Sequence, residues 1–136
     1  MRARSGFTLV EILIVVIILG ILAAIVIPQF TDASTQARLS SLKSNLQTIR
    51  SQIELYKVQH SDTPPALATF NAQMTTVGAD GYGPYLQAVP VNPFSDSNNV
   101  AAAAAPTGVG WAYTEATGEI HAGDTGETDH VAHSTW

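Results

Sequence analysis

The sequence predicts an α+β fold in which a long N-terminal helix packs against a small C-terminal β domain. Three features of the 136 residues predict it. An almost unbroken apolar run extends from Phe7 to Ile27, and a regular apolar stripe follows on a polar segment at 28–60. Alternating apolar and polar residues then occupy 109–122, a pattern typical of a half-buried β-hairpin. Beyond the apolar run, the chain is long enough for one small domain.

The apolar run is long enough to span a membrane. Its twenty-one residues would extend about 31 Å as an α-helix, which matches the thickness of a bilayer core. A secretory signal is also basic and then apolar, but its apolar part is usually about 7–15 residues and a small-residue cleavage site follows it. Here Gly6 ends a basic leader at 1–6, before the run. We therefore expect a membrane-spanning and assembly helix at 7–27, with the leader on the cytoplasmic side.

Glu11 is the one carboxylate inside the apolar run. An ionised acid in lipid costs on the order of 2.5 kcal/mol or more unless a cation pairs with it. The run contains no cation, but cleavage after Gly6 would create one, the α-amino group of Phe7. Because Glu11 lies four residues further on, the carboxylate and the new amine would share a helix face. The pair could form within one chain or between copies displaced along the axis, and the second arrangement would set an assembly register.

The segment at 28–60 is predicted to be an amphipathic continuation of the same helix, ending near His60. Pro28 removes a helical hydrogen bond and clashes with the preceding turn, so we expect a kink there. Six apolar residues at spacings of 3, 4, 3, 4 and 3 form the stripe: Leu39, Leu42, Leu46, Ile49, Ile53 and Tyr56. A coiled coil is the alternative use of this stripe, but it has fewer than three heptads. We favour packing against the protein's own C-terminal domain.

The C-terminal domain is expected at 61–136 and has little regular periodicity before the hairpin. A short helix is predicted at 66–76, and clustered Gly, Pro and Asn indicate turns at 78–84 and 92–99. The alanine run at 101–105 is of low complexity, and we expect an exposed loop insertion there.

A β-hairpin is predicted from Val109–Thr114 and Gly118–Ala122, which flank a turn at 115–117. Trp111 and Tyr113 fall on one face of its first strand and would cover the apolar helix stripe. Aromatic residues at this spacing are more often core than ligand platform, so we assign them to the core.

The charges are distributed unevenly along the chain, whose formal net charge is −5. All six Lys and Arg residues lie at or before Lys57. The acids beyond it are Asp62, Asp80, Asp96, Glu115, Glu119, Asp124, Glu127 and Asp129. This distribution disfavours nucleic-acid binding through a basic surface.

The chain carries no recognised catalytic signature. It contains no GxSxG, phosphate loop or HExxH, and the absence of cysteine removes thiol nucleophiles and disulfides. His121, His130 and His133 are an alternative zinc set, but no supporting ligand spacing accompanies them. We therefore predict that the protein is not an enzyme.

The acidic tail offers a candidate calcium site. Asp124, Glu127 and Asp129 are grouped around Gly123 and Gly126. Hard oxygen ligands on a flexible glycine loop suit Ca²⁺. The alternative is a solvated acidic tail that binds no metal.

The N-terminal features together resemble the precursors of type IV pilins and of the pseudopilins of type II secretion. Those precursors carry a short basic leader ending in Gly, then F-T-L-x-E and an apolar helix, and Gly6, Phe7, Glu11 and Pro28 stand here in that order. The resemblance covers residues 2–38. It implies cleavage between Gly6 and Phe7 by a membrane-embedded prepilin peptidase, N-methylation of Phe7 and helical packing into a filament.

The C-terminal part resembles the major pseudopilin in two places. Tyr85-Leu-Gln-Ala-Val-Pro90 precedes a Pro-rich turn, although Asn92, Phe94 and Ser95 replace the family's acidic and Trp-Gly residues there. Major pseudopilins also have a calcium-binding loop before a C-terminal Trp, and the tail at 122–136 looks like a shortened version of it.

We therefore expect a structural filament subunit of type IV pilin-like fold, with the major pseudopilin of a type II secretion system as the leading hypothesis. The resemblance implies four kinds of partner: further copies of the chain, the prepilin peptidase, minor pseudopilins and an inner-membrane assembly platform. It also implies a single-pass inner-membrane protein with a periplasmic C-terminal domain. The alternatives are a type IV pilus subunit for adhesion or motility and, in another class, a membrane-anchored calcium-binding or adhesion module.

Overall fold

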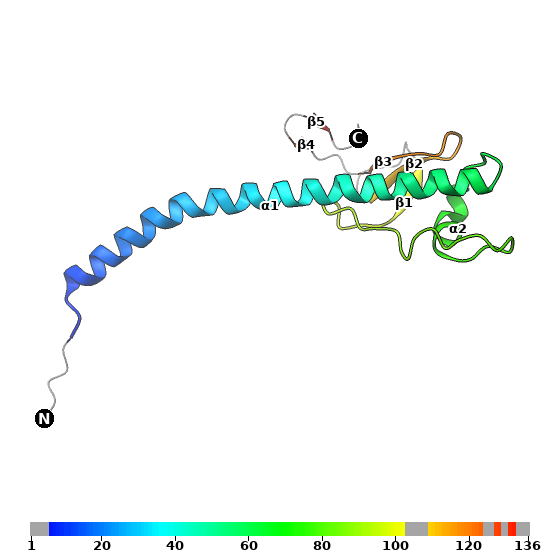
Figure 1. The fold of residues 1–136 in the computed structure, drawn as a ribbon. Coiled ribbons are helices and arrows are strands. Elements are labelled where there is room, and N and C mark those ends of the chain that lie inside the picture. Colours follow the sequence, from blue (N-terminus) through cyan, green and yellow to red (C-terminus); the bar gives the residue numbers. More distant parts are fainter. Residues whose placement is uncertain (1–5, 103–108, 124–126, 129–130, 133–136) are drawn as a thin grey trace, which may run out of the picture. The chain divides into compact units, whose positions relative to one another are not determined.

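The computed structural model describes residues 6–102, 109–123, 127–128 and 131–132. In chain order the elements are α1 (Leu9–Gln59), the 3₁₀ helix η1 (Leu67–Thr69), α2 (Phe70–Thr75), β1 (Val100–Ala102), β2 (Trp111–Thr114), β3 (Glu119–Ala122), β4 (Glu127–Thr128) and β5 (Val131–Ala132) (Figure 1). By its contacts the chain divides into two compact units, Met1–Ala37 and Arg38–Trp136. The α+β composition agrees with the predicted fold.

The helix α1 is one continuous element of 51 residues, close to the predicted extent. Pro28 lies inside it and does not end it. Next to this position, the hydroxyl of Thr31 donates to the carbonyl of Ile27 at 3.2 Å. A threonine that bonds back in this way favours bending, as proline does. The kink at Pro28 itself stays a prediction.

Two residues in the left-handed region follow the end of α1. Ser61 and Asp62 have φ values of 55° and 64°, and the amide of Asp62 donates to the carbonyl of Lys57 at 2.8 Å. Left-handed residues at this position satisfy the last helical carbonyls and turn the chain away from the axis. The helix therefore ends where the sequence indicated.

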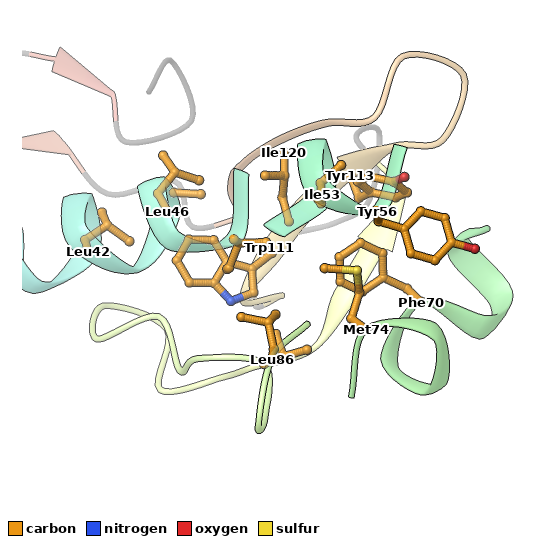
Figure 2. Packing of buried hydrophobic residues seen from close by; sticks show 13 residues of the cluster. Leu42, Leu46, Ile53, Tyr56, Phe70, Met74, Leu86, Trp111, Tyr113 and Ile120 are labelled. Carbon is orange, nitrogen blue, oxygen red and sulfur yellow. The ribbon is translucent and has the colours of Figure 1, made fainter. Parts of the chain in front are cut away.

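The predicted apolar stripe is the helical side of the core in the second unit. All six stripe residues are buried, and their exposed fractions are 7% or less. Figure 2 shows side chains from α1, α2 and β2 meeting in this core. The structure therefore confirms that the stripe packs against the protein's own C-terminal domain.

The aromatic residues of β2 form the opposite side of the core, as predicted. Trp111 and Tyr113 are 0% and 1% exposed. The indole N–H of Trp111 donates to the carbonyl of Pro90 at 2.8 Å, and the hydroxyl of Tyr113 donates to the carbonyl of Pro65 at 2.7 Å. Each ring is thus buried with its polar atom bonded to a loop, so these residues fix the loops as well as the sheet.

The three-stranded sheet has the order β1-β2-β3. β2 and β3 form the predicted antiparallel hairpin, in which Tyr113 pairs with Ile120. β1 runs parallel to β2. The prediction of an exposed loop at 101–105 is wrong for Ala101 and Ala102, because both pair with β2 through their backbone. The remainder, 103–105, lies outside the described residues.

A buried asparagine shapes the turn at 92–99. Asn92 is 0% exposed; its side-chain amide donates to the carbonyl of Gly110 at 3.0 Å, and its Oδ1 accepts the amide of Phe94 at 2.9 Å. A Cβ added at Gly110 would overlap the carbonyl oxygen of Ser97. The turn and the start of β2 are therefore close enough that only glycine fits at residue 110.

Candidate assembly site at the start of α1

The first turn of α1 is closed by a reciprocal pair of residues. The amide of Thr8 donates to Oε2 of Glu11 at 2.9 Å, and the Thr8 hydroxyl donates to the same oxygen at 3.0 Å. The amide of Glu11 in turn donates to the Thr8 hydroxyl oxygen at 3.2 Å. This is a capping box, in which the side chains at both ends of the turn satisfy amides that the helix cannot.

The capping box gives Glu11 a structural role that our sequence analysis missed. The signal was present as Thr8-x-x-Glu11, the pattern that marks a helix start. Both Thr8 donors are neutral, so they orient the carboxylate without neutralising its charge. In this chain Phe7 is joined to Gly6 by a peptide bond, so the predicted pair between Glu11 and a Phe7 amine is a prediction for the cleaved protein.

Gly6 and Phe7, the predicted processing residues, are both exposed and lie before α1, outside any helix or strand. The Phe7 side chain is 82% exposed, and a Cβ added at Gly6 would meet nothing within 4 Å. The chain itself therefore has room for a side chain at position 6.

The start of α1 exposes a continuous apolar surface. Every large apolar side chain from Leu9 to Ile27 is more than 40% exposed. By length and composition α1 is able to cross a membrane. An apolar surface of this extent calls for a nonaqueous environment, either lipid or other helices.

The predicted calcium ligands cannot be assembled from the described residues. Asp124 and Asp129 lie outside them, and Glu127 belongs to β4, where only the backbone is described. Within the described part of the chain, no three His, Cys, Asp or Glu residues are placed to hold a metal. Calcium binding by the tail stays a prediction.

The alternative zinc set is not brought together in the described part of the chain. Its residues His130 and His133 lie outside the described residues, while Nδ1 of His121 lies 3.5 Å from a guanidinium nitrogen of Arg50. A neighbouring positive charge disfavours cation binding at His121.

Comparisons with known proteins single out the same N-terminal region of the chain. Residues 1–27 match the family model described as the prokaryotic N-terminal methylation motif. The chain is 38% identical over 104 residues to type II secretion system core protein G of Pseudomonas aeruginosa. The aligned region covers 70% of this chain and 71% of the relative. The chain is 28% identical over 100 residues to the protein of the same name in Klebsiella pneumoniae, covering 69% and 71%.

A shorter match is to the type IV narrow pilus major component PilA5 of Thermus thermophilus, at 41% identity over 64 residues, 47% of this chain and 54% of the relative. No solved structure matches the chain. A methylation motif, an exposed apolar helix and extensive identity to core protein G converge on one assignment: the chain belongs to the pilin and pseudopilin family that includes type II secretion system core protein G.

Proposed function

We propose that the protein is a structural subunit of a type II secretion filament, the major pseudopilin. The observation that carries the proposal is the 38% identity to a type II secretion system core protein G over 104 residues, which extends well beyond the N-terminal motif at 1–27. Matches limited to the motif would fit any filament subunit of this class. Similarity that continues into the C-terminal domain favours the secretion subunit.

The exposed apolar surface of α1 supports polymerisation through the helix. The residues before Pro28 bury none of their large apolar side chains, whereas the second unit completes its own core from the later stripe. Before assembly the first surface would reside in the membrane, and in a filament equivalent helices would cover it. The same surface thus serves both states without refolding of the C-terminal domain.

Processing would produce the charge that assembly uses. We propose that a prepilin peptidase cuts between Gly6 and Phe7 and that Phe7 is then N-methylated. The new amine would lie one helical turn from Glu11, whose carboxylate is already oriented by Thr8. A buried charge left without its partner costs about 3–5 kcal/mol, so the pair between copies would make one axial register far more stable than others.

The partners and the location follow from the family. We propose that the chain is anchored in the inner membrane with its C-terminal domain in the periplasm, and that it assembles with its own copies, minor pseudopilins and an inner-membrane platform. Its role is structural and no catalysis is assigned to it.

The test is deletion of the gene in its source bacterium, with complementation by wild type, by Glu11→Gln and by Glu54→Gln. Glu54 is a matched control because it is an exposed carboxylate on the same helix, with its side chain 67% exposed. We expect deletion and Glu11→Gln to leave secreted enzymes in the periplasm, while Glu54→Gln restores their export. Export that is unaffected by deletion would contradict the proposal.

The second candidate is a type IV pilus subunit. It rests on the match to the PilA5 pilus component and on 43% identity over 54 residues, 40% of this chain and 35% of the relative, to a fimbrial protein of Pseudomonas aeruginosa. These matches are shorter than those to core protein G. Loss of surface pili and of surface motility on deletion, with export intact, would favour this candidate over the first.

A further inference from the structure

A cavity of about 390 Å³ lies beside the end of α1 and has no part in the proposed filament function. Its walls come from the last turns of α1, from α2 and from the segment at 78–85. It is lined mainly by Tyr56, His60, Gln73, Asp80, Tyr82 and Tyr85. All of these residues belong to the unit Arg38–Trp136, so the cavity is formed within the C-terminal domain.

The aromatic side chains of the lining pack against one another. His60 stacks on Tyr56 with ring centroids 3.9 Å apart and planes 5° apart. Tyr85 meets Tyr56 edge to face at 5.3 Å, and Tyr82 meets His60 in the same way at 5.8 Å. Tyr82 is 45% exposed, so one ring of this aromatic wall is open to solvent. Aromatic rings have electron-rich faces, which attract cations.

Hydrogen bonds hold this wall in place. The amide of Tyr85 donates to the carbonyl of Met74 at 3.0 Å, and its hydroxyl donates to Oε1 of Gln59 at 2.6 Å. The turn before Tyr85 is closed by the amide of Gly78, which donates to the carbonyl of Tyr82 at 2.8 Å. A ligand would therefore meet a surface that is already ordered, which lowers the entropic cost of binding.

Asp80 brings one negative charge to the cavity. Its Oδ1 accepts the amide of Tyr82 at 3.2 Å, and its Oδ2 lies 2.7 Å from Nε2 of His60. The pKa of Asp80 is lowered, first by the hydrogen bond from the Tyr82 amide, so the carboxylate is ionised. Each carboxylate oxygen has a second lone pair, and the Asp80 side chain is 40% exposed. Both oxygens are therefore able to accept a further donor.

The chain supplies no lysine or arginine to this carboxylate within its described part. Neither residue type lines the cavity, and none follows Lys57 in the sequence. Nζ of Lys57 itself lies 3.1 Å from Oε1 of Glu54 and 3.9 Å from Oδ1 of Asp62. An aromatic wall and an ionised carboxylate thus share a cavity to which neither Lys nor Arg contributes.

We propose that this cavity binds the guanidinium group of an arginine side chain presented by a partner protein. A guanidinium is planar, stacks on aromatic rings and donates two parallel hydrogen bonds to a carboxylate. Tyr82 offers an exposed ring next to Asp80, whose two oxygens match the paired donors. A lysine ammonium is a more strongly hydrated point charge, and it makes neither the flat stack nor the paired hydrogen bonds. The chemistry of the cavity therefore favours arginine over lysine.

The surroundings of the cavity favour a protein as the source of the arginine. Val77, beside the turn, is 61% exposed and provides an apolar rim that the neighbours of the arginine would cover. The acids beyond Lys57 are not balanced by any Lys or Arg in the same segment, so the domain attracts basic segments over a longer range. A single arginine in a partly open cavity predicts millimolar affinity, which suits a contact that forms and breaks repeatedly.

The first test uses the full chain, labelled with ¹⁵N, in detergent micelles. The probe is a blocked tripeptide with arginine between two alanines, and its matched control carries citrulline, which has the same shape without the charge. We expect the arginine peptide to shift the backbone amide signals of 78–82 in a saturable way, and the citrulline peptide to bind about tenfold more weakly. The corresponding lysine peptide should also bind more weakly than the arginine peptide. Equal affinity for the arginine and citrulline peptides would overturn the proposal.

Three variants locate the contact, and the indole N–H signal of Trp111 reports that each retains its core. Asp80→Asn removes the charge and should weaken binding of the arginine peptide about tenfold. Tyr82→Leu keeps an apolar side chain without the ring and should weaken it about two- to fivefold. Wild-type affinity in Tyr82→Leu would contradict the stacking.

Asp62→Asn is the matched control for Asp80→Asn. Its side chain is 92% exposed and does not line the cavity, and asparagine tolerates the backbone φ of 64° at this position. We expect this variant to bind the arginine peptide as wild type does. Equal losses in Asp62→Asn and Asp80→Asn would reveal a general attraction to the acidic domain and would refute a specific site.

Two other occupants are distinguished by the same amide signals. The first is a second copy of the chain: signals at 78–82 that shift as the concentration of the chain alone is raised would overturn the assignment to a different protein. The second is a small guanidinium compound. Ethylguanidinium that bound as tightly as the arginine peptide would show that the neighbours of the arginine make no contact, which would rule out recognition of a protein segment. We expect no shift in the first experiment and weaker binding in the second.

Discussion

Replacing Tyr113 by Phe removes a single hydroxyl from the centre of the core. That hydroxyl donates to the carbonyl of Pro65 at 2.7 Å, and both side chains are almost fully buried. A hydrogen bond contributes about 0.5–1.5 kcal/mol net, and a buried carbonyl left without a donor costs about 1–3 kcal/mol. The ring contact with Phe70, at 4.9 Å between centroids, is retained. We expect the free energy of unfolding to fall by about 2 kcal/mol.

The same substitution should change the response to alkaline pH. Burial, followed by the charge of Glu115, raises the pKa of Tyr113 above its ordinary value of 10.0. Above that pH the phenol ionises in the unfolded chain and stays neutral in the folded one, so wild type loses stability as the pH rises. Tyr113→Phe lacks this group and should lose stability less steeply above pH 10, although it is less stable at neutral pH.

The assay is urea unfolding of the fragment 33–136, followed by the fluorescence of the buried Trp111, at neutral pH and above pH 10. Tyr82→Phe is the matched control because Tyr82 is 45% exposed. A surface change of this kind should stay within about 0.5 kcal/mol of wild type. If Tyr113→Phe were as stable as Tyr82→Phe at neutral pH, the account of a buried and essential hydroxyl would be refuted.

Four further outcomes are expected. Mass spectrometry should find the mature protein beginning at a methylated Phe7. Gly6→Val should leave the precursor uncut, because a branched side chain beside the scissile bond obstructs the peptidase. Assembled filaments that retain the leader would contradict this prediction. Glu11→Gln should insert into membranes normally yet yield few sheared filaments, because an unpaired buried amine costs about 3–5 kcal/mol per subunit; a normal yield of processed filaments would count against the register. Chelation of calcium should lower the melting temperature of 33–136 if the acidic tail binds the ion, and unchanged melting across millimolar calcium would leave the tail as a solvated segment. Arg50→Met, which loses two donors to the carbonyl of Ile120 at 2.8 and 3.1 Å, should destabilise the same fragment by about 1 kcal/mol in urea unfolding; wild-type stability would show that the aliphatic part of the side chain suffices.

The core was predictable because two regular patterns meet in it. The stripe that includes Ile49 and Ile53 follows the helical period, and Trp111 and Tyr113 follow the strand period. The buried face of each element could therefore be predicted from its own sequence, without knowledge of its partner. Once each element has one apolar face, burial leaves few ways to pair them. The fold class and these two faces of the core therefore followed from local sequence, whereas the contributions of Phe70, Met74, Leu86 and Val89, which follow no regular period, did not.

β1 was not predictable for the opposite reason. Alanine at successive positions such as Ala101 and Ala102 gives no alternation, and its pairing with β2 depends on backbone groups that every sequence shares. The tie between His60 and Asp80 joins positions twenty residues apart that follow no period. The capping box differs from both, because the pattern Thr8-x-x-Glu11 is visible in the sequence and predicts it. The sequence analysis considered only the charge of Glu11 and not its hydrogen bonds to the first turn.

The buried stripe of α1 also determines where this protein can tolerate a change of length. One residue inserted between Leu46 and Ile49 would rotate everything beyond it by about 100° around the helix axis. Ile53 and Tyr56 would then leave the core, and polar neighbours would enter it. Substitutions on the outer face of the helix do not disturb that alignment. Added length should therefore be tolerated best in the exposed parts of the connections between elements, such as 61–63 and 79–82, which makes these segments the natural places for insertion of a tag or an epitope.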